Sequence, residues 1–303
     1  MPELPDIVVY IHALERKCTG HQLKRVQLLS PFVLRSVTPS TEDIRGLHLT
    51  GVSRLGKRIV LELENEIFIV IHLMIAGRLH WKPIGTKTGG KINLAAFEFD
   101  NGTLLFTEAS SKKRASITFV SGREGLQEHH RGGLEPLESD LPNFFSMLTS
   151  ENHTLKRALT DPHLFSGIGN AYSDEILHRA QLSPMKLTSR LTEEEMSRLY
   201  VATVSILREW IDRLTLEVGD GFPDKVTAFR KEMAVHGKYG QPCPVCGSAV
   251  QRIAYADNEC NYCVTCQTDG KLSADRGLSR LMKGDWPKSL SELEDRKAKH
   301  GST

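Results

Sequence analysis

The feature that most constrains the fold of this chain is a pair of Cys-x-x-Cys motifs in its last quarter. Cys243-Pro-Val-Cys246 and Cys263-Val-Thr-Cys266 are separated by sixteen residues, enough for a β-hairpin. Four thiolates at this spacing are typical of one tetrahedral zinc ion. Such a site has no open coordination position, so we expect it to be structural. Buried, unligated cysteines are the less favoured alternative, and Cys260 lies outside the pairing.

The rest of the composition is that of an ordinary globular protein of about two domains. Of six cysteines, five fall between residues 243 and 266, whereas a secreted disulfide protein would spread them along the chain. No apolar stretch approaches the roughly 20 residues that span a bilayer, and the start MPELPDIVVY lacks the pattern of a secretory signal. We therefore expect a cytoplasmic protein. The net charge of +2 neither indicates nor excludes a nucleic-acid partner, because local clustering decides that.

Hydrophobic periodicity divides the chain into two structural classes. Residues 5–18 have helical spacing, and residues 23–120 are rich in β-type runs separated by turn signals such as Asn101-Gly102. From residue 141 onward the runs are helical. This pattern predicts an α+β protein with an N-terminal β-sandwich or barrel, one leading helix and a helical second domain. The predicted boundaries are a sandwich at 1–121, a linker at 122–140, a helical domain at 141–239, a finger at 240–267 and a charged extension at 268–303. The extension has helical patterns at LSRLM and SLSELEDRKAK, and we expect its end to be frayed.

The N-terminus offers a nucleophile if Met1 is removed. Pro2 would then present a secondary amine, and an α-amino group with a pKa of about 7.7–8.0 is partly neutral near pH 7. Attack of that amine on an aldehyde-like carbon gives an iminium, the electron sink of Schiff-base catalysis. Glu3 is placed to move protons. A proline that only begins a helix is the commoner reason for this residue at position 2.

Two further segments suggest contacts with phosphate. Ser166-Gly-Ile-Gly-Asn170 precedes a helical run, and free N–H groups at a helix start favour anions. A tight helix–helix turn explains the same glycines equally well. Arg54-Leu-Gly-Lys57-Arg58 precedes a strand, so a glycine turn can project Lys57 toward a phosphate. A solvated turn lysine is the commoner case.

Together, in this order, these motifs resemble the formamidopyrimidine-DNA glycosylase/endonuclease VIII family. The resemblance runs from Pro2 to Gln267 through PELPD, RLGKR, IHLMIAGRL, LKRALTD, GIGNAYSDEIL, HGKYGQPCPVCG and CVTCQ. It implies a helix–two-turns–helix domain and a zinc finger. It also implies a bifunctional glycosylase and abasic-site lyase of base excision repair, acting on damaged double-stranded DNA as a monomer, with one structural zinc.

The resemblance also implies roles for individual residues. Pro2 attacks the anomeric carbon, Glu3 transfers protons at the opened sugar, and Lys57 contacts phosphate and supports catalysis. Asn170 matches a phosphate-binding asparagine and Lys156 a nearby basic residue. A damaged nucleotide is flipped from the stack. The further DNA contacts expected are Lys91, Lys112, Lys113, Arg114 and the wedge residue Ile75.

Several positions depart from the family pattern. Asn258 stands where the finger usually carries an arginine; candidate substitutes are Arg252 in the same hairpin and Lys271 or Arg276 in the extension. Ile92 stands near the position of a phosphate-binding histidine, with Lys91 beside it. Ile75 replaces a wedge methionine, and the loop Ser110–Arg114 is basic without an aromatic residue. These departures leave a second hypothesis, a DNA-damage-binding protein with weak or no catalysis. They also leave the preferred base open.

Overall fold

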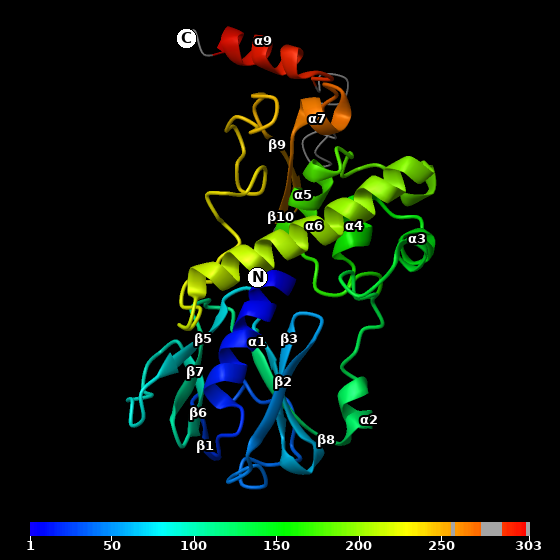
Figure 1. The fold of residues 1–303 in the computed structure, drawn as a ribbon. Coiled ribbons are helices and arrows are strands. Elements are labelled where there is room, and N and C mark those ends of the chain that lie inside the picture. Colours follow the sequence, from blue (N-terminus) through cyan, green and yellow to red (C-terminus); the bar gives the residue numbers. More distant parts are fainter. Residues whose placement is uncertain (256–257, 274–286, 301–303) are drawn as a thin grey trace. The chain divides into compact units, whose positions relative to one another are not determined.

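The structure is a computed structural model that describes residues 1–255, 258–273 and 287–300. Its compact parts form two units, Met1–Gly133 with Arg208–Ala228, and Leu134–Leu207 with Phe229–Thr303. Within the described residues, no helix combines the length and the apolar run needed to cross a bilayer. Figure 1 shows the helices and strands of each unit, coloured along the sequence.

The first unit contains two four-stranded antiparallel sheets and a leading helix, α1 (Leu4–Cys18). Strands from both sheets and the apolar face of α1 contribute to one buried core, in which Ile7, Leu61 and Phe106 are fully buried. This arrangement confirms the predicted sandwich with one leading helix. One sheet has the order β1 (Leu23–Leu28), β6 (Asn93–Phe99), β7 (Gly102–Glu108), β5 (Gly77–Lys82); the other has the order β2 (Leu49–Leu55), β3 (Arg58–Leu63), β4 (Ile67–His72), β8 (Ser116–Ser121).

The predicted linker contains an element that the polar sequence did not suggest. Helix α2 (Gly122–Gln127) buries Leu126 against Val60, Phe68 and Val120. These three side chains point away from the main core because successive residues of a strand face opposite sides of a sheet. A short helix therefore covers the outer face of the β3–β4–β8 sheet, and the division between the units falls at Gly133, inside the segment expected to be a linker.

One turn differs by a residue from the expected position. Phe99 pairs directly with Gly102, so Asp100 and Asn101 form the turn between β6 and β7, and Gly102 begins β7. A side chain at Gly102 would meet the ring of Trp81 at 2.3 Å. The glycine therefore permits close packing of the neighbouring strand and does not supply the turn.

Helices and a hairpin make up the second unit. The buried ring of Phe144 lies 4.8 Å from Phe165 and 5.4 Å from Tyr200 between ring centroids, and these aromatic contacts join α3, α6 and the segment before α5. The helices are α3 (Leu141–Thr149), α4 (Leu155–Thr160), α5 (Asn170–Arg179) and α6 (Glu193–Val218). Residues of α6 from Arg208 onward belong to the first unit. The finger contains β9 (Gln251–Tyr255), β10 (Asn258–Tyr262) and α7 (Val264–Thr268). Short 3₁₀ turns lie at Glu64–Glu66 and Thr188–Arg190.

The described part of the C-terminal extension contains the helix that the pattern of SLSELEDRKAK predicts. Residues Leu290–His300 form helix α9, and Lys271 bridges to Ser289. Leu272 and Leu290 pack against the buried face of the hairpin, which includes Ile253 and Tyr262. The helical pattern expected at LSRLM lies outside the described residues. The described part of the extension thus supports the finger.

Candidate active site

The N-terminal residues begin α1 and are held by a local hydrogen bond. The Glu3 backbone N–H donates to Asp6 Oδ2 at 2.9 Å, one half of a capping box. Pro5 lies in the first turn, where its missing N–H costs nothing. Pro2, Glu3 and Asp6 are buried, whereas Met1 is 37 % exposed. The sequence therefore places Pro2 and Glu3 at a fixed point on the first unit.

The α-amino group at the start of the chain is surrounded by both signs of charge. Burial lowers its pKa, and the charges of Arg78 and Lys57 act in the same direction, while Glu3 and Asp6 act to raise it. Lys57 reaches this cluster from the two-residue turn between β2 and β3, since Leu55 pairs directly with Arg58. Gly56, at φ 61°, supplies the left-handed conformation that this tight hairpin requires. The charges of Glu3 and Lys57 thus both act on the Met1 amine, and the catalytic roles of Pro2, Glu3 and Lys57 stay a prediction.

Arg78 is a member of this cluster that the sequence reasoning did not identify. Its guanidinium donates to the carbonyl of Val226 at 2.8 Å and to those of Gly77 and Ile75 at 2.6 and 3.2 Å. It therefore joins two segments far apart in the sequence. The only sign of this role in the sequence was a basic residue directly after the Ile-Ala-Gly turn. A solvent-exposed lysine or arginine on a strand would give the same sequence pattern.

The expected wedge residue lies at the tip of a sharp turn. Ile75 is 61 % exposed, and the Gly77 N–H donates to the Leu73 carbonyl at 2.8 Å. Met74 has φ 53°, and a Cβ at Gly77 would lie 2.2 Å from the Leu73 oxygen. Only glycine fits at that point, so the turn is fixed and presents the apolar Ile75 side chain to solvent.

The basic loop is organised by a buried carboxylate. Glu108 is 1 % exposed and accepts the backbone N–H groups of Arg114 (3.0 Å) and Ala115 (3.2 Å). Lys113 also donates to the Glu108 carbonyl. The side chains of Lys112, Lys113 and Arg114 are exposed, as is Lys91 on another connection. The loop backbone is therefore held in place while its cations remain at the surface.

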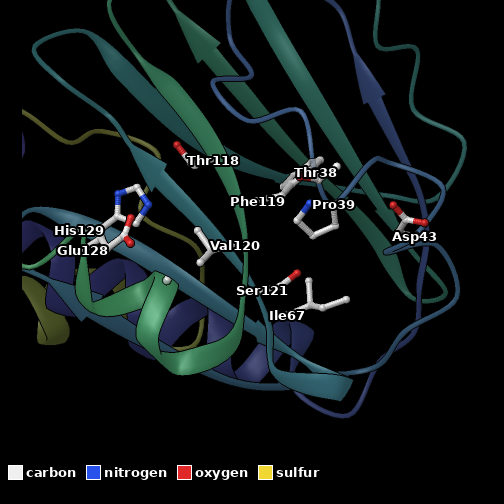
Figure 2. Close-up of a pocket in the computed structure, with 11 residues that line it drawn as sticks. Thr38, Pro39, Asp43, Ile67, Thr118, Phe119, Val120, Ser121, Glu128 and His129 are labelled. Atoms are coloured by element: carbon white, nitrogen blue, oxygen red, sulfur yellow. The ribbon is translucent and has the colours of Figure 1, made fainter.

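A groove at the β8 edge of the first unit is a separate feature. Figure 2 shows its lining, with Asp43 at one end and Glu128 and His129 at the other, around Phe119 and Val120. Its volume is about 620 Å³. Pro2, Glu3 and Lys57 are not among its lining residues. The groove is therefore distinct from the N-terminal cluster.

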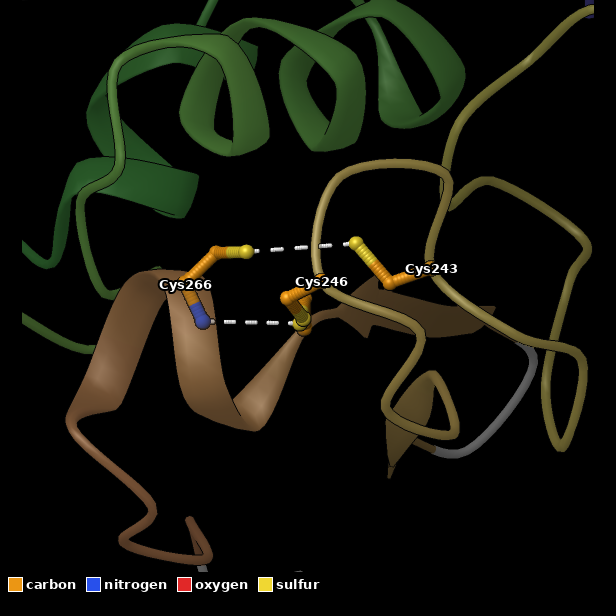
Figure 3. Close-up of side chains that lie close together, drawn as sticks. Cys243, Cys246 and Cys266 are labelled. Carbon is orange, nitrogen blue, oxygen red and sulfur yellow. Dashed lines mark hydrogen bonds between the residues drawn. The ribbon is translucent and has the colours of Figure 1, made fainter.

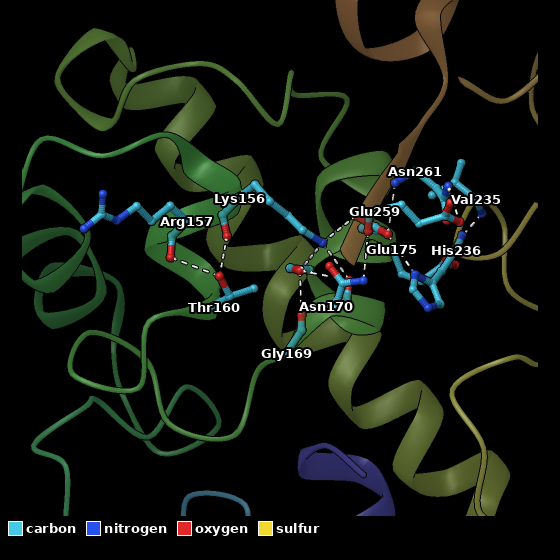
Figure 4. A network of polar contacts seen from close by, with 12 residues as sticks. Lys156, Arg157, Thr160, Gly169, Asn170, Glu175, Val235, His236, Glu259 and Asn261 are labelled. Atoms are coloured by element: carbon cyan, nitrogen blue, oxygen red, sulfur yellow. Dashed lines mark hydrogen bonds and ion pairs between the residues drawn. The ribbon is translucent and has the colours of Figure 1, made fainter. Parts of the chain in front are cut away.

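In the second unit, Lys156 is buried and paired. Its Nζ lies 2.6 Å from Asp174 Oδ1 and donates to Ser173 Oγ and the Asn170 carbonyl at 2.8 and 2.7 Å. Lys156 is 8 % exposed, in contrast to the basic loop. Its role as a DNA contact stays a prediction, and what the structure assigns to it is a link between α4 and α5 (Figure 4).

Asn170 begins α5 and is half-buried. Its Nδ2 donates to the Glu259 carbonyl on β10 at 2.9 Å. This contact ties the glycine-rich turn to the finger hairpin, which the sequence did not reveal (Figure 4). Phosphate binding by Asn170 stays a prediction.

Two adjacent carboxylates on α5 extend this network to the finger. Asp174 Oδ2 lies 2.8 Å from His236 Nδ1 and accepts the Asn261 backbone N–H at 3.1 Å. Glu175 accepts the backbone N–H groups of residues 234–236 at 2.7–2.9 Å. Burial raises the pKa of Glu175, and the three backbone donors oppose that shift. The chain that enters the finger is therefore held by side chains of one helix.

The four paired cysteines lie together, and Figure 3 labels three of them, Cys243, Cys246 and Cys266. All four Sγ atoms lie within 4.8 Å of one another, with Cys246 and Cys263 at 3.3 Å and Cys243 and Cys266 at 3.9 Å. Ligands about 2.3 Å from a tetrahedral ion are about 3.8 Å apart. The cluster therefore fits one metal ion. Cys260 is fully buried on β10, outside the cluster.

The hairpin carries Asn258 exposed on β10. Arg252, a candidate substitute for the missing arginine, lies 3.2 Å from a Glu259 oxygen and 4.5 Å above the ring of Tyr239. Its charge is thus matched within the finger. Lys271 is exposed, and Arg276 lies outside the described residues.

Comparisons with known proteins agree with this arrangement. A family model for the formamidopyrimidine-DNA glycosylase N-terminal domain matches residues 1–113, and one for the formamidopyrimidine-DNA glycosylase H2TH domain matches residues 133–218. The chain is 31 % identical to formamidopyrimidine-DNA glycosylase from Heliobacterium modesticaldum, over 88 % of this chain and 100 % of that protein. It is 32 % identical to the Thermus thermophilus enzyme, over 89 % and 100 %.

Similarity of fold extends to solved structures. Lactococcus lactis Fpg in complex with DNA containing an abasic site has a TM-score of 0.77 and 23 % identity, covering 88 % of this chain and 99 % of that one. The sequence similarity to the Heliobacterium modesticaldum and Thermus thermophilus proteins spans the whole length of both. The chain therefore belongs to the formamidopyrimidine-DNA glycosylase family.

Proposed function

We propose that this protein is a DNA glycosylase with abasic-site lyase activity that removes oxidised or ring-opened bases in base excision repair. The observation that carries the proposal is the cluster of Glu3, Lys57 and the α-amino group on the first unit of a family member. The damaged base and the DNA strand would be substrates. The protein would act as a monomer on chromosomal DNA in the bacterial cytoplasm.

Removal of Met1 makes the Pro2 nitrogen the reacting group. Its lone pair bonds to the anomeric carbon of the damaged nucleotide, and the bond to the base breaks, with the base leaving as it gains a proton. Glu3 gives a proton to the ring oxygen as the sugar opens, and an iminium forms between Pro2 and the sugar. Loss of a proton from the next carbon then expels the 3′ phosphate. Hydrolysis of the iminium releases the amine.

The surroundings of the amine suit this sequence of steps. Burial and the charges of Arg78 and Lys57 lower the pKa of the Met1 amine. The Pro2 amine would begin the same buried helix start, so we expect a shift in the same direction and a larger neutral, nucleophilic fraction near pH 7. Lys57 can also neutralise a phosphate next to the lesion. The exposed cations of the basic loop and Lys91 supply contacts that do not depend on sequence. Ile75, at its rigid turn, fits the role of filling the gap left by a flipped base.

Zinc is the metal that the four-cysteine cluster suits best. Cys243, Cys246, Cys263 and Cys266 would hold one ion with no open position, so the ion would support the fold of the finger and take no part in bond breaking. The finger in turn carries the residues that approach the DNA backbone.

A second function, damage binding with weak or no catalysis, is favoured by one observation. Asn258 is exposed on the hairpin where a permanent positive charge is usual in the family, and Arg252 is paired with Glu259. A scaffold that lacks this charge can still bind an abasic duplex through its other cations. The two functions differ in whether a covalent intermediate forms.

Borohydride trapping on an abasic duplex separates the two functions. We expect protein whose mass shows loss of Met1 to form a reduced covalent complex, and Glu3→Gln to cut strand cleavage about 10²- to 10⁴-fold. Pro2→Gly should retain some trapping because a primary amine remains. Protein whose α-amino group is blocked should trap nothing. Binding without any trapping would favour the damage-binding function, whereas undiminished trapping by protein with a blocked N-terminus would make a lysine, such as Lys57, the nucleophile.

A further inference from the structure

A histidine contacts the cysteine cluster from outside the four ligands. His178 lies in the last turn of α5 and is 6 % exposed. Its Nε2 lies 3.2 Å from Cys243 Sγ. The two residues are 65 positions apart in the sequence, so the contact is made by the tertiary fold.

The chemistry of a four-thiolate site gives this contact a direction. A ligating thiolate has no proton, so it can only accept, and the imidazole must carry its proton on Nε2 and donate it. Four thiolates around a divalent ion leave a net charge of −2. Cys243 is 3 % exposed, so water does little to stabilise its share of this charge.

The other donors near the cluster do not replace His178. The Cys266 backbone N–H points to Cys263 Sγ at 3.4 Å, and the Cys243 backbone N–H is used by the Ser248 carbonyl at 2.8 Å. Among the hydrogen bonds of the described residues, the donor to Cys243 Sγ from outside the finger is His178. This buried ligand is thus supported from α5.

We propose that His178 is a positioning residue of the metal site, which donates its Nε2–H to the Cys243 thiolate and so couples metal binding to helix α5. The inference rests on the proposal that the cluster holds zinc. The same helix begins at Asn170 and holds the entry to the finger through Asp174 and Glu175. A loaded site therefore fixes both ends of α5 against the finger.

Metal affinity is the first measurement, made on the full-length protein by competition for Zn²⁺ with a chromophoric chelator. His178→Phe keeps a planar ring but removes the donor, and we expect it to weaken Zn²⁺ binding about 10- to 100-fold, the usual effect of losing an outer hydrogen bond to a metal ligand. His178→Gln, which can still donate, should recover part of the loss. His163→Gln, at an exposed histidine of the same unit, is the control and should bind as wild type does.

Substitution with Co²⁺ gives a readout that packing alone would not move. A hydrogen bond lowers the energy of the thiolate electrons, so removal of the donor should shift the thiolate-to-cobalt charge-transfer bands of His178→Phe to longer wavelength. The bands of His178→Gln should lie closer to those of wild type. If Phe and wild type share both affinity and spectrum, His178 only fills space.

The same measurements distinguish a failure of the role of His178 from a failure of the metal site. A wild-type protein that binds neither Zn²⁺ nor Co²⁺ through thiolates overturns the metal site itself. A wild type with a four-thiolate cobalt spectrum, together with unchanged His178 variants, overturns only the role of His178. If His178→Phe does not fold, the comparison of His178→Gln with His178→Ala in the same spectrum decides the question.

Discussion

The two units arrange their clustered charges in different ways. In the first unit, burial lowers the pKa of the Met1 α-amino group, and the charges of the half-buried Arg78 and Lys57 act in the same direction. In the network of the second unit, Lys156 is matched at 2.6 Å by Asp174, whose other oxygen is held by His236 and the Asn261 backbone. The first cluster favours the uncharged form of an amine, whereas the second joins three segments of chain.

This difference shows what each kind of polar cluster does for the molecule. A buried pair with all its hydrogen bonds made adds little net stability, but it fixes one arrangement of its neighbours. A cluster with cations near an amine tunes chemistry without needing a rigid mutual geometry. The comparison therefore predicts that changes in the network act on stability and changes near the amine act on reactivity.

The largest effect is expected from breaking the network at its centre. Asp174→Ala leaves the Lys156 ammonium buried without its carboxylate and removes the partner of His236, so we expect the free energy of unfolding to fall by about 3–5 kcal/mol. Urea-induced unfolding of the full chain measures this. Asp212→Ala, at an exposed position, should change it by no more than about 0.5 kcal/mol.

A double variant sharpens this test. Lys156→Met added to Asp174→Ala removes the unpaired charge and should recover part of the lost stability, since the penalty belongs to the isolated ion. No recovery, or a loss from Asp174→Ala as small as that of the control, would mean that the network does not support the unit.

The next effect concerns the hairpin that the network holds. Asn258→Arg adds a permanent positive charge at an exposed position without touching the network. A charge-assisted hydrogen bond to phosphate is worth about 1.5–3 kcal/mol, or roughly 10- to 100-fold in rate if felt in the transition state. We expect wild type to cleave mainly by β-elimination and Asn258→Arg to increase the δ-eliminated product by that factor. A gel that separates the two product ends measures the ratio.

Salt dependence provides an independent check on the same variant. One more phosphate contact should steepen the fall of DNA affinity with salt by about one unit of slope. Wild type that already gives mostly δ-eliminated product, with no change in Asn258→Arg, would show that another residue supplies the charge. Lys271 and Arg276 would then be tested in turn.

A smaller effect is expected at the apolar face of the hairpin. Leu272 and Leu290, from the described part of the extension, are partly buried against Ile253 and Tyr262. Leu290→Ala should lower the free energy of unfolding of the metal-loaded protein by about 1–2 kcal/mol, less than full burial would give. Val201→Ala, at a largely exposed apolar residue, should change it little. Equal effects of the two substitutions in thermal unfolding would exclude a supporting role for the extension.

The smallest effect tests the cluster around the amine. Because the protonated amine cannot attack, trapping should rise with pH through the pKa of the Pro2 amine. We expect that amine to feel the burial and the cations that lower the pKa of the Met1 amine, so the rise should lie below pH 8. Arg78→Gln removes a cation that lowers the pKa, so the rise should move to higher pH. Trapping at pH 6 should fall roughly two- to fivefold, a fraction of a pKa unit, with the plateau at high pH unchanged.

Charge and geometry can be separated at the same position. Arg78→Lys keeps the positive charge but cannot reproduce the three bonds to Val226, Gly77 and Ile75. Its pH profile should resemble that of wild type. A profile like that of Arg78→Gln would show that the hydrogen bonds, and not the charge, control the amine.

The sequence by itself determined the features that depend on neighbouring residues. Periodicity of two and of 3.6 separated the sandwich strands from helices α3 to α6, because each pattern buries one face of its own element. The local spacing of the Cys-x-x-Cys pairs identified the four cysteines whose sulfur atoms the fold brings together. The capping contact between Glu3 and Asp6, three residues apart, is of the same local kind.

Only the tertiary structure decided the features made by distant residues. Lys156 looked like a surface cation, but its partner Asp174 comes from another helix and meets Asn261 from 87 positions away. The contacts of Arg78 and His178 and the packing of α2 on its sheet were likewise decided by the tertiary structure. The local sequence determines the charge of a side chain and the face of the helix on which it lies. Its partner depends on which distant segments the buried core brings together.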